Sequence, residues 1–81
     1  MKAIINIGLK KGVLDSQGKA AHHTLDTIGF NEIVKDVRIG KQIVMELNCT
    51  DKEEATKQAS QMCEKLLANT VIEDYEITIE D

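Results

Sequence analysis

The sequence predicts a small α+β domain in which an antiparallel sheet carries two helices on one of its faces. The expected order of elements is β-α-β-β-α-β. Four short segments alternate apolar and polar residues with period two, and two other segments repeat apolar residues with the helical period. A short polar junction that contains glycine separates the two middle strands, which is typical of a hairpin. With 81 residues, the chain is expected to form one domain, residues 1–81.

The first strand and the first helix are expected at residues 3–9 and 16–28. Asp15 can cap the helix, because its carboxylate can accept hydrogen bonds from the free amides of the first turn. Gly29 can end it, since glycine tolerates the positive φ that a helix terminus often needs. The apolar side chains that share one face are Ala3, Ile5, Ile7 and Leu9 in the strand, and Ala21, Leu25 and Ile28 in the helix.

A β-hairpin is expected where "IVKDVRIG" (residues 33–40) is followed by "KQIVMELN" (residues 41–48). Gly40 and Lys41 would lie at its turn. The alternating apolar residues are Val37 and Ile39 in the first segment, and Ile43, Met45 and Leu47 in the second.

The second helix is expected to begin at Thr50, because Thr50 and Glu53 match a capping box. Asn69 is the expected residue just past its end. Its apolar stripe consists of Ala55, Ala59, Met62, Cys63, Leu66 and Leu67. The last strand lies within "VIEDYEITIE" (residues 71–80), with Val71, Tyr75, Ile77 and Ile79 on one face.

This order of elements is the split-βαβ pattern of ferredoxin-like folds. The core has to be built from Ile, Leu, Val, Ala and Met, because the chain has no Trp, one Phe and one Tyr. A domain of this size buries only about 60–65% of its surface, so extending the core across a subunit interface would add stability. We therefore expect a homo-oligomer. Ile4, Val44 and Ile72 are expected on the sheet face that the helices leave open.

Composition argues against several classes of protein. The net charge is −4 and five acidic residues fall in the last nine positions, so the basic surface and stacking aromatic residues of a nucleic-acid-binding protein are not expected. The apolar run near the N-terminus is too short to span a membrane and lacks the pattern of a signal peptide, so we expect a cytoplasmic protein. In that compartment Cys49 and Cys63 are expected to be free thiols.

We expect no catalytic, cofactor-binding or metal-binding residue in this chain. His22 and His23 are adjacent, so they would diverge by about 100° around a helix, and no third ligand stands beside them. The segment "KKGVLDSQGK" (residues 10–19) could hold an anion at a helix start, but a capping aspartate would occupy the same amides. Arg38 and Lys41 could dock a carboxylate or a phosphate, or could form a solvated hairpin tip.

Three stretches, "GVLDSQG", "DVRIGK" and "MCEKLLANTVIEDYEI", resemble in order and spacing the PurS family. PurS is the small subunit of phosphoribosylformylglycinamidine (FGAM) synthase in organisms that divide this enzyme into separate chains. The resemblance covers essentially the whole chain and implies a PurS-like fold. One departure is Ser16, where the family commonly has proline. Because proline presets the first turn of a helix, its absence is expected to loosen the helix start without altering function.

The resemblance also implies a function. FGAM synthase converts formylglycinamide ribonucleotide (FGAR), ATP, glutamine and water into FGAM, ADP, phosphate and glutamate in purine biosynthesis. A glutaminase subunit, PurQ, releases ammonia, and a synthetase subunit, PurL, activates the substrate with ATP and Mg²⁺. By this resemblance the chain would be a non-catalytic adaptor between the two, with no cofactor of its own, and would form a homodimer or a tetramer.

Two regions lie within the stretches that resemble the PurS family and are the candidates for contact with PurQ and PurL. Their residues are Arg38, Gly40 and Lys41 at the expected hairpin tip, and Asn69, Val71, Glu73 and Tyr75 at the second helix–strand junction. The competing hypothesis is a free-standing ferredoxin-like regulatory module that binds a small ligand at its dimer interface.

Overall fold

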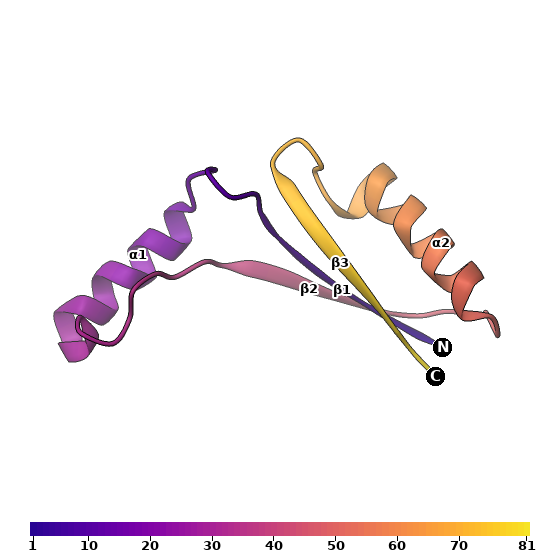
Figure 1. The fold of residues 1–81 in the computed structure, drawn as a ribbon, viewed down its shortest axis with the longest axis horizontal. Coiled ribbons are helices and arrows are strands. Elements are labelled where there is room, and N and C mark those ends of the chain that lie inside the picture. Colours follow the sequence, from indigo (N-terminus) through magenta and orange to yellow (C-terminus); the bar gives the residue numbers. More distant parts are fainter.

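The computed structural model describes residues 1–81 and shows a three-stranded antiparallel sheet with one helix packed on it (Figure 1). A second helix lies on residues 10–30, which extend away from the sheet in Figure 1 and are called the arm. In chain order the elements are β1 (Lys2–Leu9), α1 (Ser16–Leu25), η1 (Asp26–Phe30), β2 (Gly40–Glu46), α2 (Lys52–Met62), η2 (Cys63–Leu67) and β3 (Glu73–Glu80). The short segments η1 and η2 continue α1 and α2 as wider helical turns, and η1 is kinked at Gly29, whose φ and ψ are not helical. The predicted α+β class, with an antiparallel sheet and two helices, is confirmed.

The core lies between the central strand β1 and helix α2. In the sheet order β2-β1-β3, alternation along β1 turns Ala3, Ile5 and Ile7 toward α2, where each is at most 2% exposed. The helical segment opposite them contributes Ala55, Ala59 and Cys63, which are fully buried. Because these side chains are small, α2 can lie close to the sheet, and the core between them is thin.

Both helix starts depend on an aspartate. Asp15 caps α1 as predicted, because its Oδ1 accepts a hydrogen bond of 2.8 Å from the amide of Gly18. The expected capping box at Thr50 is wrong: Asp51 is the cap, and its Oδ1 accepts from the amide of Glu53 at 3.1 Å. Asp51 has an extended backbone, so α2 begins one residue later than a Thr50 cap would place it.

The helix ends differ from each other. Gly29 has φ of 108°, so the glycine predicted to end the first helix does adopt the conformation that only glycine takes easily. Asn69 follows the extended C-cap residue Ala68, as expected for the position just past the helix. It does not need a positive φ, because its side chain oxygen instead accepts a hydrogen bond of 3.2 Å from the amide of Val71.

The strand expected at residues 33–40 and its hairpin are wrong. Residues 34–39 are not paired with any strand, and β2 begins at Gly40, giving the order β-α-β-α-β. The polar groups of this segment bind the arm instead: the amide of Ile39 donates to Asp15 Oδ2 at 2.6 Å, and His22 Nε2 lies 3.2 Å from the carbonyl oxygen of Val34. Gly40 lies opposite Gly8 in the ladder with β1 rather than at a turn.

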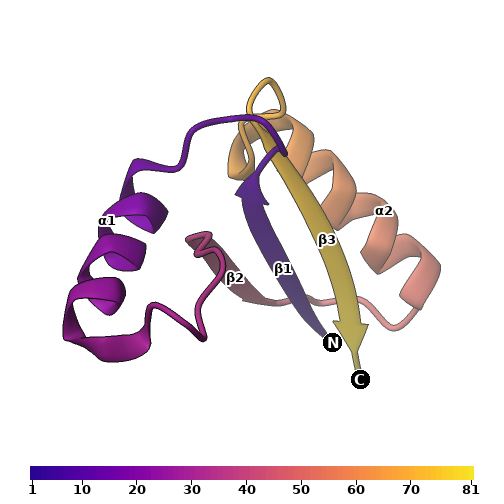
Figure 2. The same ribbon diagram turned by 60° about the vertical axis from the view of Figure 1, so that its left-hand side comes forward.

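The expectation that both helices cover one sheet face is also wrong for the single chain. In Figure 2, α2 lies behind β1 and β3, whereas α1 stands apart from the sheet. Gly18 is the only buried residue of α1. The radius of gyration is 16.1 Å, whereas a compact chain of this length would have about 12 Å. Residues 31–39 run alongside α1 instead of forming a strand of the sheet, so the arm stays extended. Only nine of the 81 residues are buried as a result.

Candidate partner-binding surface

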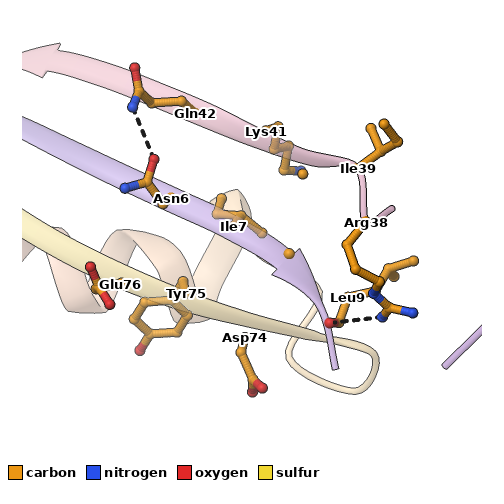
Figure 3. Close-up of a pocket in the computed structure, with 12 residues that line it drawn as sticks. Asn6, Ile7, Leu9, Arg38, Ile39, Lys41, Gln42, Asp74, Tyr75 and Glu76 are labelled. Atoms are coloured by element: carbon orange, nitrogen blue, oxygen red, sulfur yellow. Dashed lines mark hydrogen bonds between the residues drawn. The ribbon is translucent and has the colours of Figure 1, made fainter. Parts of the chain in front are cut away.

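Five of the seven predicted contact residues meet at the end of the sheet where β1 finishes. Arg38, Gly40, Lys41 and Tyr75 line an open groove of about 650 Å³, shown in Figure 3. Glu73 lines a smaller hollow of about 320 Å³ beside it, which Gly40 and Lys41 also border. Two stretches that are more than 30 positions apart in the sequence are therefore brought together.

Arg38 fastens the arm to the sheet. Its guanidinium donates to three main-chain carbonyl oxygens, those of Leu9 at 3.3 Å, Lys10 at 3.2 Å and Val13 at 3.2 Å (Figure 3 shows the bond to Leu9). These carbonyls belong to the end of β1 and the loop before α1. The side chain is exposed, but its hydrogen-bonding groups are used within the chain, so Arg38 shapes the groove.

Asp15 completes this junction and was not among the predicted site residues. It is 5% exposed, and its two oxygens accept from Gly18 and Ile39. The hydrogen bond from the Ile39 amide, followed by that from Gly18, holds the pKa of the Asp15 carboxyl below its usual value. Its capping role can be predicted from the sequence. Its bond to Ile39 depends on the tertiary fold and has no local signal.

The turn between η2 and β3 is closed by its own side chains. Glu73 Oε1 accepts from the amide of Asn69 at 2.7 Å, and Glu73 Oε2 lies 3.9 Å from Lys41 Nζ. The carbonyl oxygen of Asn69 accepts from the amides of Ile72 at 3.0 Å and Glu73 at 2.7 Å. Val71 stands on this braced turn with 82% of its surface exposed. The turn therefore presents Val71 to solvent on a hydrogen-bonded support.

Tyr75 ties β3 to the helical layer. Its hydroxyl donates to Glu64 Oε2 at 2.6 Å and lies 3.3 Å from Ser60 Oγ. The hydrogen bond to the Glu64 carboxylate raises the pKa of the Tyr75 hydroxyl, because ionisation would remove the donor. Tyr75 is thus occupied within the chain and Lys41 is paired with Glu73, whereas Val71 is available to a partner.

The histidines and cysteines, the side chains that could have indicated metal binding or catalysis, do not form a cluster. His22 Nε2 lies 3.6 Å from Asp26 Oδ1, while His23 is exposed beside it. No group of three or more His, Cys, Asp or Glu residues is arranged to hold a metal ion. Both cysteines are free thiols, and burial raises the pKa of the Cys63 thiol. None of the helices has the length and apolar character needed to span a membrane.

Comparison with known proteins identifies the family. The PurS family model, described as phosphoribosylformylglycinamidine (FGAM) synthase, matches residues 2–81. This chain belongs to the PurS family. It is 45% identical over 80 residues to the PurS subunit of Bacillus subtilis, a match that covers 99% of this chain and 93% of that protein. It is 43% identical to the PurS subunit of Methanocaldococcus jannaschii, with 98% of this chain and 94% of that protein covered.

Solved PurS structures share the fold. The crystal structure of Methanocaldococcus jannaschii PurS superposes with a TM-score of 0.89 at 42% identity, covering 99% of this chain and 95% of that one. A chain in the structure of PurLQS from Thermotoga maritima superposes with a TM-score of 0.86 at 33% identity, covering 95% and 93%. The protein is therefore a PurS subunit of phosphoribosylformylglycinamidine synthase, an enzyme of purine biosynthesis.

Proposed function

We propose that this PurS chain is a non-catalytic adaptor that bridges the glutaminase PurQ and the synthetase PurL and supports ammonia transfer between them. The assembled enzyme converts FGAR, ATP, glutamine and water into FGAM, ADP, phosphate and glutamate. The main support is the match of this chain to one in the PurLQS structure from Thermotoga maritima. Five of the predicted contact residues fit an adaptor, because they line two neighbouring hollows at one end of the sheet.

Ammonia transfer explains why such an adaptor is needed. In neutral water most ammonia is protonated and loses its nucleophilic lone pair, so a closed path between the two active sites preserves the intermediate. ATP and Mg²⁺ belong to the synthetase subunit in this proposal, and the PurS chain holds no cofactor. The hydrogen-bonded turn carrying Val71 and the groove beside Lys41 would contribute contacts that align the larger subunits in the cytoplasm.

The adaptor is proposed to act as a homodimer. The chain exposes 5970 Å², whereas a compact protein of this mass would expose about 4,850 Å². The excess of about 1,100 Å² exceeds the roughly 800 Å² per partner that a typical stable interface buries. The arm and the segment that follows it also carry large exposed side chains: Leu14, Ile28, Phe30, Ile33 and Ile39.

The second copy is proposed to place its arm on the inner face of β2. Helix α2 packs mainly on β3 and β1, which leaves Ile43 and Met45 of β2 only half-buried on the side of the sheet that faces the core. An arm from the partner would cover them beside α2, and the exchange would be reciprocal about a two-fold axis. Each chain would then regain the two-helix layer that the single chain lacks.

Light scattering tests the dimer. We expect wild-type protein to have twice the chain mass at micromolar concentration and Ile28→Asp to have the mass of one chain. Leu66→Asp is a matched control, because Leu66 is also exposed but lies outside the arm. A monomeric wild-type protein, or a monomer produced equally by the control, would contradict the exchanged arm.

Reconstitution tests the adaptor. Glutamine-dependent FGAM formation by PurL and PurQ should require this chain. If the chain can be omitted without loss of activity while a small ligand raises its melting temperature, the free-standing regulatory module is the better interpretation and the adaptor is rejected.

A further inference from the structure

The face of the sheet opposite α2 carries a charge pattern that the proposed arm exchange leaves uncovered. Residues paired directly across antiparallel strands point to the same side, so the register defines this face. From β2 through β1 to β3 its rows are Glu46, Lys2 and Glu80; Val44, Ile4 and Thr78; Gln42, Asn6 and Glu76; and Gly40, Gly8 and Asp74. We call these twelve residues the open face. It holds four carboxylates and one ammonium group.

The negative charge gathers along β3. Asp74, Glu76 and Glu80 follow one another on the open face with only Thr78 between them and no cation on that strand. The nearest guanidinium, that of Arg38, is held by three carbonyl oxygens at the end of the groove. The molecule's two ion pairs involve none of these acids. The carboxylates are therefore free to pair with a partner.

Part of this acidic surface borders the groove at the end of the sheet. Gly8 and Gly40 form a floor without side chains, beside a Gln42 amide that donates to Asn6 Oδ1 at 3.0 Å (Figure 3). Strand glycines often mark places where another main chain approaches closely. A Cβ on Gly8 would meet no atom within 4 Å, so the chain's own packing does not demand glycine there, whereas a Cβ on Gly40 would lie 2.7 Å from the main-chain oxygen of Ile7. Asp74 and Glu76 border the same groove.

We infer that the open face docks an extended, basic segment of one of the larger synthase subunits, which rests on the Gly8–Gly40 floor and aligns Lys or Arg side chains with the β3 carboxylates. This inference rests on the proposed adaptor function and adds the chemistry of the partner. Alternate residues of an extended segment are about 7 Å apart, which is the spacing of Asp74 and Glu76 along β3. A second PurS copy is disfavoured as the occupant, because two such faces would bring carboxylates against carboxylates.

The test varies charge and shape separately. Asp74→Asn with Glu76→Gln removes two charges without changing side-chain size, and Glu54→Gln is the control on the outer side of α2. Gly8→Ala and Gly8→Val raise the floor by increasing amounts. The readout is the concentration of PurS that gives half-maximal glutamine-dependent activity with fixed PurL and PurQ, at low and at high salt.

We expect the double variant to need about 10-fold more PurS at low salt, with a smaller salt dependence than wild type. Gly8→Val should raise the requirement more than Gly8→Ala, and Glu54→Gln should leave it unchanged. Circular dichroism and light scattering check that each variant keeps its fold and mass. The inference is overturned if wild type supports activity and the double variant does so equally well, or if neutralisation instead drives PurS alone into tetramers. Loss of any need for wild-type PurS would reject the adaptor function itself.

Discussion

Replacing Gly18 with alanine should destabilise this protein, although alanine is the better helix former. At an exposed interior position, Gly→Ala stabilises a helix by about 1 kcal/mol. Here a Cβ would lie 2.9 Å from Asp15 Oδ2 and closer still to the main-chain oxygen of Val37. Main-chain atoms cannot swing aside, and overpacking of this kind costs about 1–3 kcal/mol. Subtracting the propensity gain leaves a net loss of up to about 2 kcal/mol, since the segment that contains Val37 has to move away from α1.

Urea denaturation of wild type and Gly18→Ala at equal protein concentration measures this difference, because the proposed dimer would make stability depend on protein concentration. Ala20→Gly is the control for propensity alone, since Ala20 is exposed on the same helix and should lose about 1 kcal/mol. A Gly18→Ala variant more stable than wild type by the full propensity gain would refute the close packing of residues 31–39 on α1.

Three further results are expected. Ile5→Ala should cost about 2–5 kcal/mol in urea denaturation, because Ile5 is fully buried at the centre of the thin core, and a value near zero would contradict that core. The pKa of Asp15 is lowered in the folded state, so its contribution to stability is present above the ordinary value of 3.8 and is lost as pH falls below it toward the folded pKa. Acid titration of Asp15→Asn should show a shallower loss in that range, and an unchanged profile would remove Asp15 as its source. Val71→Lys should leave the melting temperature unchanged, because the side chain is 82% exposed, but should raise the PurS concentration needed for half-maximal synthase activity about 10-fold. Equal activity at all concentrations would exclude Val71 from the interface.

Local elements could be predicted because their signals are local. The period-two pattern of β1 reflects burial of alternate residues against α2, and Asp15 and Gly29 act within a few residues of their own positions. The prediction of a strand at residues 33–40 is wrong because strand pairing depends on residues that are distant in the sequence. Val37 and Ile39 alternate with polar residues as in a strand, but the Val37 amide donates to Asp36 Oδ1 and the Ile39 amide to Asp15 Oδ2, and the pattern does not encode these partners. A period-two pattern indicates an extended segment and does not specify a neighbouring strand.

The candidate site was predicted by position more successfully than by role. Arg38 and Tyr75 do lie at the groove, yet the side chain of each forms hydrogen bonds within the chain. Whether such a residue is bound within the chain or free for a partner depends on distances between elements, and these distances are set only when the chain folds. The acidic open face was missed, although the acids at alternate positions of the last strand were its visible signal. Which side of the sheet they occupy follows from the strand register.

The adaptor function is tested most directly by comparing two nitrogen sources in the reconstituted enzyme. PurL and PurQ are assayed for FGAM formation with glutamine or with an ammonium salt, each with and without this PurS chain. We expect the chain to be required with glutamine and to make little difference with ammonium, because free ammonia needs no sealed path between subunits. Equal glutamine-dependent rates with and without the chain would contradict its role as the adaptor.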